Sequence, residues 1–192
     1  MSEQAQITLA RQGDPTAWIA IIRQHQQAVF RFAWLLLGDA DEADDIAQET
    51  FIRAFRALDS FDDERPLRPW LLQIAKNLAT NRRRSLGRYL AAVGRWLLTQ
   101  RDMAQEHSGR DPAHTSAHLA TSDELVRAVC RLNSEAQEII YLRYFLELSV
   151  AETAEALNIA PGTVKSRLSR AIERLRTVVA DEFPALGKEG AR

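Results

Sequence analysis

The sequence predicts an all-α protein made of two small helical domains joined by a flexible linker. Three observations favour this fold class: apolar residues recur at helical spacing, the alternation typical of strands is almost absent, and the 192 residues include only 8 glycines and 6 prolines. We place the domains at residues 5–84 and 122–180, with the linker at residues 85–121. With 46% hydrophobic residues, the chain can bury one medium core or two small ones.

The first domain is expected to contain a short helix near residues 7–12 and a long helix that starts at Pro15. Asp14 is a suitable N-cap, proline is favoured at the first helical position, and Gly38 can end the helix. A second helix is expected over residues 40–58, with Phe55 among its inward residues, and a third over residues 69–84. Because each carries an apolar stripe, these helices can share one core.

The pattern loosens from residue 85, where a short amphipathic helix could form before a polar linker. Helices are expected again over residues 122–131, from about residue 134, and over residues 149–157. Ser134 with Gln137, and Ser149 with Glu152, have the spacing of capping boxes. Cys130 lies in an apolar stretch and should be buried. As the only cysteine, it excludes an internal disulfide and a cysteine-based zinc site within one chain.

Charge is distributed unevenly along the chain, although the formal net charge is only −1. Residues 39–64 hold ten acidic and two basic side chains, whereas residues 65–110 hold ten basic and two acidic ones. Such asymmetry indicates two kinds of partner. The N-terminal stretch lacks the apolar segment of a signal peptide, and no apolar run could span a bilayer. We therefore expect a cytoplasmic protein without membrane insertion.

Residues 149–176 have the features of a helix-turn-helix. The first helix is expected to end in a tight turn at Asn158 and Ile159, and Pro161 is well placed to start the second. Small and basic side chains on the second helix can reach base edges and phosphates in a major groove. The alternative is a solvated basic face on an ordinary pair of helices. The candidate DNA contacts are Thr163, Lys165, Ser166, Arg167, Ser169 and Arg170.

Three segments resemble bacterial RNA polymerase sigma factors of the extracytoplasmic-function (ECF) type, group 4 of the sigma-70 family. SVAETAEALNIAPGTVKSRLSRAIERLR (149–176) resembles their −35 reading domain, although response regulators carry related segments. DADEADDIAQETFIRAFR (39–56) resembles the helix that grips core polymerase, and RPWLLQIAKNLATNRRR (68–84) the helix that opens and holds the −10 element. The resemblance covers residues 5–84 and 122–179. Ser169 is smaller than its counterpart in some relatives, so the −35 sequence cannot be carried over.

The resemblance implies two further sets of site residues and three partners. The clamp helices of the largest core subunit would bind Asp41, Asp44, Asp45, Gln48 and Glu49. The −10 strand would bind Lys76, Asn77, Asn81, Arg82, Arg83 and Arg84, with cations on its backbone and amides on an extruded base. Residues 60–68 would form part of the pocket wall, whereas Trp70 is expected in the core. Promoter DNA and an anti-sigma factor are the remaining implied partners.

Two other functions stay open at this point: a stand-alone helix-turn-helix regulator that binds operator DNA without core polymerase, and an adaptor that binds proteins through both domains. No catalytic triad, phosphate-binding glycine loop or paired-carboxylate cleft is apparent, so we expect no enzyme, no catalytic residue and no cofactor. His114 and His118 have a spacing that could bind a metal on a helix. The surrounding glycine, proline and serine argue against a helix there, so no metal site is expected.

Overall fold

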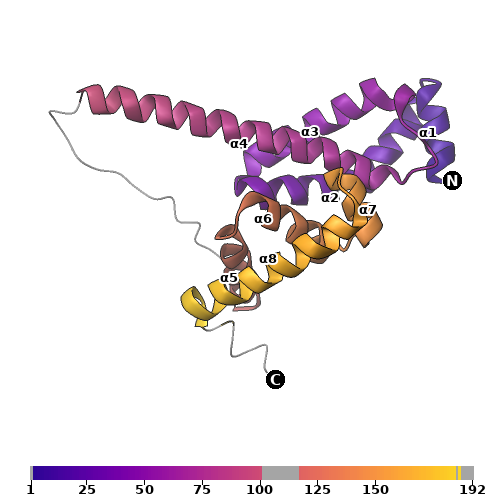
Figure 1. Ribbon diagram of the computed structural model, residues 1–192. Helices are drawn as coiled ribbons and strands as arrows, with labels where there is room; N and C mark the ends of the chain where they lie inside the picture. Colours follow the sequence, from indigo (N-terminus) through magenta and orange to yellow (C-terminus); the bar gives the residue numbers. More distant parts are fainter. Residues whose placement is uncertain (1, 101–116, 185, 187–192) are drawn as a thin grey trace.

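The computed structural model describes residues 2–100, 117–184 and 186, and this part of the chain is helical without strands, which confirms the predicted fold class (Figure 1). The elements are α1 (Glu3–Arg11), α2 (Pro15–Leu37), α3 (Ala40–Ala57), a 3₁₀ turn η1 (Leu58–Ser60), α4 (Leu67–Gln100), α5 (Ala117–Cys130), α6 (Ser134–Ile140), a π-helical turn η2 (Tyr141–Phe145), α7 (Val150–Leu157) and α8 (Pro161–Glu182). None of the described helices is long and apolar enough to cross a membrane.

Helices α2, α3 and α4 pack around the core of the N-terminal domain, and α1 packs against α2 (Figure 1). The predicted ends of α2 are confirmed. The Asp14 carboxylate accepts hydrogen bonds from the backbone N–H groups of Thr16 and Ala17, and Gly38 ends the helix in the left-handed region at φ +72°. Any other residue at position 38 would be strained, since side chains with a Cβ rarely adopt this conformation.

A carboxylate from α1 bonds to the first turn of α4. Glu3 Oε2 accepts a hydrogen bond from the backbone N–H of Leu67 at 3.3 Å, while Glu3 Oε1 lies 3.1 Å from Nε2 of His25 on α2. His25 is only 4% exposed. A negative charge at a helix N-terminus is stabilising because the N–H groups of the first turn have no partner inside the helix. One residue of α1 therefore joins three helices.

The C-terminal domain is built around α6, α7 and α8. Ser149 and Glu152 form the predicted capping box at the start of α7, and Asn158 ends that helix with φ +54°. The second predicted box is wrong: Asn133 caps α6, and the buried amide of Gln137 donates instead to the carbonyls of Cys130 and Leu132. In α8, Val164 and Ala171 are buried.

Three further details differ from the sequence-based expectations. Helix α4 does not end at residue 84 but continues through Gly87 and Gly94 to Gln100, because no proline interrupts it and neither glycine ends it. Phe55 is 51% exposed although its position fits the inward stripe, because it lies at the edge of that stripe and contacts Trp18. Cys130 is exposed at the end of α5. Residues 101–116 of the predicted linker, including His114, lie outside the described part.

The two domains contact each other along one side of α4. Arg68 Nη2, near the start of α4, donates to the carbonyl of Leu146 at 2.8 Å, and the guanidinium of Arg65 lies 3.7 Å from the Glu155 carboxylate on α7. Figure 1 shows α7 between α4 and α8. The ring of Trp70 packs against Phe61 in a tilted arrangement with 4.6 Å between ring centroids, and it is half-buried against the core rather than within it, where it was expected.

The buried His25 predicts a specific loss of stability in acid. Burial lowers the pKa of His25 below its ordinary value of 6.5, and the Glu3 charge offsets only part of this shift. As the pH falls below 6.5, the unfolded chain therefore binds a proton on this imidazole that the folded chain does not bind. The free energy of unfolding keeps its full value above pH 6.5 and decreases as the pH falls below it. Relative to His25→Gln, the parent should lose up to about 1.4 kcal/mol of unfolding free energy per pH unit.

Urea unfolding of both proteins between about pH 7.5 and 5.5 measures this difference. Parallel pH profiles for the two proteins would contradict the assignment of acid sensitivity to His25.

Candidate polymerase and nucleic-acid interfaces

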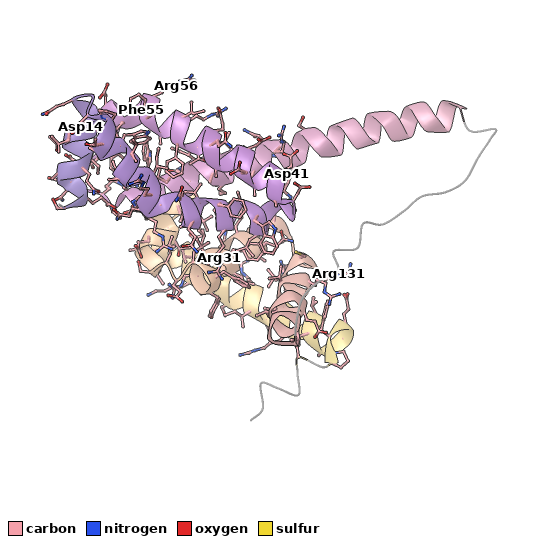
Figure 2. The ribbon with its side chains drawn as sticks, turned by 180° about the vertical axis from the view of Figure 1, so that it is seen from behind. Asp14, Arg31, Asp41, Phe55, Arg56 and Arg131 are labelled. Atoms are coloured by element: carbon pink, nitrogen blue, oxygen red, sulfur yellow. The ribbon has the colours of Figure 1, made fainter. Side chains whose placement is uncertain are left out.

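The acidic residues predicted to bind core polymerase share the outer face of α3. Asp41, Asp44, Asp45 and Gln48 are exposed and Glu49 is half-buried, whereas the opposite face packs into the core. This separation follows from the helical period, which puts residues 41, 44, 45 and 48 on one side. Figure 2 shows Asp41 at the end of α3 beside which α4 leaves the body of the molecule, and Phe55 and Arg56 at the other end.

Most of these polar side chains already have partners. Gln48 Nε2 donates to the Asp44 carboxylate at 2.7 Å, and Arg53 Nε donates to Glu49 at 2.7 Å, both one turn apart on α3. Asp45 instead bonds to a different helix, because its Oδ2 lies 3.3 Å from Nη2 of Arg82 on α4. The face is therefore an ordered arrangement of ion pairs and hydrogen bonds.

Two grooves flank the acidic face. A groove of about 520 Å³ between α3 and α4 is lined by Asp45, Gln48, Glu49 and Ile52 on one side and by Leu78, Asn81 and Arg82 on the other. A groove of about 530 Å³ between α2 and α3 has the more apolar lining, with Ile22, Phe30, Ala47 and Phe51 beside Asp44 and Gln48. Sequence analysis missed Phe30 and Ile52 as surface residues. The signal was present, since the apolar stripes of α2 and α3 are wider than one buried face requires.

The residues predicted to hold the −10 strand do not form a single cluster on α4. Asn77, Asn81 and Arg84 are exposed at helical spacing on one face. Arg82 turns to α3, where it pairs with Glu42 and Asp45. Lys76 and Arg83 lie beside α6 of the C-terminal domain.

On that side of α4, Arg83 Nη1 lies 3.4 Å from the Gln137 side-chain oxygen. Burial raises the pKa of Glu138, and the nearby charges of Lys76 and Arg83 oppose this rise. Glu138 thus lies in a partly desolvated contact between the domains, opposite two candidate strand-binding cations.

The segment between η1 and α4, predicted to form a wall of the base pocket, is tied down at both ends. Arg11 donates to the carbonyls of Leu58 and Phe61 and pairs with Asp63 at 3.4 Å. At the other end, Arg65 pairs with Glu155. This segment is therefore shaped by α1 on one side and by α7 on the other.

The predicted −35 contacts fall on the first half of α8. Lys165, Ser166, Ser169 and Arg170 are exposed, while Thr163 and Arg167 are half-buried at the edge of the helix. Arg167 Nη1 lies 3.6 Å from a Glu135 carboxylate oxygen, so this arginine also braces α8 against α6. Arg174 joins Arg167 and Arg170 around a small hollow between the two helices, and sequence analysis did not single it out. The turn before α8 follows the prediction, with Asn158 in the left-handed region and Pro161 at the first helical position.

Comparison with known proteins gives two family matches. Their order along the chain agrees with the resemblance seen in the sequence. The Sigma-70 region 2 family matches residues 21–89, and the Sigma-70 region 4 family matches residues 122–175. A helical region 2 followed by a helix-turn-helix region 4 defines a transcription initiation factor of the sigma-70 class. Curated relatives narrow this class.

The ECF RNA polymerase sigma factor SigW of Bacillus subtilis is 34% identical over 185 residues, which cover 94% of this chain and 98% of the relative. The ECF RNA polymerase sigma factor SigL of Mycobacterium tuberculosis is 32% identical over 179 residues, which cover 92% and 97%. The chain belongs to the ECF RNA polymerase sigma factors.

Solved structures share the arrangement of helices. CnrH in complex with the cytosolic domain of CnrY superimposes with a TM-score of 0.69, covering 94% of this chain and 98% of that one at 23% identity. The sigma factor RpoE in complex with the anti-sigma factor NepR, from Bartonella quintana, gives a TM-score of 0.64 at 27% identity, covering 85% and 96%. The protein is thus an RNA polymerase sigma factor by family, and the remaining question is which of its residues carry each contact.

Proposed function

We propose that three surfaces of this sigma factor make three different contacts during transcription initiation. The acidic face of α3 binds core polymerase, the exposed side of α8 binds the −35 duplex, and Asn77, Asn81 and Arg84 on α4 hold the melted −10 strand. The observation that carries the proposal is the segregation of charge: carboxylates face outward on α3, whereas Arg84 on α4 and Lys165 and Arg170 on α8 are exposed cations. Residues 5–84 and 122–180 would then be the polymerase-binding and −35-binding domains, acting in the cytoplasm.

The contact between the domains bears on strand binding. Arg83 contacts Gln137 in this structure and the charge of Lys76 lies near Glu138, so binding of these two cations to the −10 strand would exchange these interactions for interactions with phosphates. Asn77 and Arg84 are exposed without such a rearrangement.

An anti-sigma factor is the proposed regulator. Two of the structural neighbours are CnrH with CnrY and the sigma factor RpoE with the anti-sigma factor NepR. RpoE is 27% identical to this chain, which supports regulation by an anti-sigma factor here as well.

Charge reversal on α3 tests the core-binding surface. Asp45→Lys should weaken association with core polymerase by several kcal/mol, because a lysine would face a basic partner and stand beside Arg82. Gln48→Ala should have a milder effect. Competition for purified core against the parent protein measures the affinity. Asp59→Lys, a matched reversal at the exposed residue of η1, is the control. Equal competition by the Asp45→Lys protein and the parent would show that α3 does not bind core.

Substitutions on α8 separate base contacts from phosphate contacts. Arg170→Ala should reduce the free energy of promoter binding by about 1–3 kcal/mol and relax base preference at one −35 position. Lys165→Ala should weaken binding to all promoter sequences alike and lower by about one the slope of log binding constant against log salt concentration. Selection of bound promoter variants by holoenzyme measures both effects. Arg127→Ala, an exposed charge on α5, is the control. If base preference and salt dependence are unchanged in both variants, other residues read the −35 element.

A substitution on α4 tests base capture. Asn77→Ala should leave core binding and −35 binding near normal but reduce open complexes, because the amide can donate to and accept from an extruded base. Permanganate reactivity of unpaired thymines, on a duplex promoter and on one with a pre-melted −10 bubble, measures this. The variant should lose discrimination at one −10 position even on the bubble. Unchanged reactivity and base preference on both templates would reduce Asn77 to a scaffold residue.

A further inference from the structure

Arg82 belongs to the candidate strand-binding helix, yet its guanidinium lies on the candidate core-binding face. Its Nε donates to the carboxylate of Glu42, and its Nη2 lies 3.3 Å from Oδ2 of Asp45. Glu42 and Asp45 are three residues apart on α3, so both carboxylates point to the same side of the helix. Together they form a site for one cation, which Arg82 fills from the neighbouring helix.

This ion pair differs from the others on the same face. Gln48 and Arg53 bind Asp44 and Glu49 from one turn away on α3 itself, so those contacts remain with the helix when a partner docks. Arg82 reaches across from α4 and can be displaced by rotation of its own side chain. The site is open to solvent, since the side chains of Arg82 and Asp45 are 46% and 68% exposed. An external cation can therefore approach.

The groove between α3 and α4 fits a partner that carries such a cation. Beside Asp45 it offers the partly exposed Ile52 and the side chain of Leu78. A basic residue flanked by apolar ones on a partner helix would match both the charge and the apolar lining. The guanidinium of Arg82 shows within this chain which kind of group the carboxylates accept.

We propose that Arg82 is an intramolecular competitor of core polymerase. Its guanidinium occupies the site between Glu42 and Asp45 that receives a cationic side chain of the core subunit, so Arg82 limits the affinity of the free chain for core. This inference rests on the proposed binding of core by α3. It assigns to Arg82 a role on the core-binding face, distinct from strand binding.

The test measures binding of the full-length chain to purified core polymerase without DNA. Arg82→Ala should tighten binding about two- to fivefold at low salt, because core no longer has to displace an exposed ion pair. The gain should shrink at high salt, where exposed charges are screened. Arg82→Lys retains the charge and should fall between the parent and Arg82→Ala. Thermal melting confirms that each variant is folded.

Arg56→Ala is the matched control, because it removes the same charge from the end of α3 far from Asp41 (Figure 2). Binding of Arg82→Ala no tighter than the parent, or equal tightening by Arg56→Ala, would overturn the proposal. Asp45→Lys distinguishes an error in the competitor role of Arg82 from an error in the assignment of core binding to α3. If Asp45→Lys weakens binding while Arg82→Ala does not tighten it, only the competitor role is wrong. If Asp45→Lys has no effect, the assignment of core binding to α3 is wrong as well.

Discussion

The apolar side of α4 is buried against α2 and α3, and the positions of all candidate sites on the N-terminal domain follow from that packing. Leu67, Leu71, Leu72, Ala75 and Ala79 are fully buried, so the residues between them must face outward or toward the second domain. Glu3 fixes the start of this helix, and Arg68 joins it to the C-terminal domain. Because α4 is one continuous helix, the polar residues that line its exposed sides keep fixed positions relative to the acidic face of α3.

The distribution of charge explains how a chain with a net charge of −1 can act on DNA. Non-specific affinity for DNA comes mainly from neutralising phosphates, and a nearly neutral chain has little of it. Several of its cations are also engaged internally: Arg82 with α3, Arg83 with Gln137, and Arg167 with Glu135. Association with core polymerase would link the two DNA contacts in one assembly and raise their effective concentration. Weak separate contacts then suffice.

Much of the fold could be predicted from local signals. The caps of α2 and α7 and the turn before α8 depend on a few residues with fixed conformational preferences, such as Asp14, Gly38 and Asn158, and these predictions are confirmed. The cap of α6 could not be read in the same way. Asn133 and Ser134 are both good caps, and the buried contacts of Gln137, which depend on tertiary packing, decide between them.

The candidate sites were harder to predict than the fold. The residues of α3 and α8 lie on the expected outer faces, because helical spacing determines which side chains share a side. The six residues of α4 do not share one face, since Arg82 turns to α3 and Lys76 and Arg83 turn to α6. The bond of Arg82 to Asp45 joins residues 37 positions apart and that of Arg83 to Gln137 joins residues 54 positions apart, and no local pattern in the sequence reports them.

Run-off transcription with purified core polymerase, on templates selected from randomised −35 and −10 sequences, shows whether this protein directs initiation through both elements. We expect a transcript of defined length only when core and this protein are both present, and its loss when either selected element is scrambled. Equal binding of the protein to its DNA with and without core, together with no transcript in the presence of core, would show that it is not an initiation factor of this kind.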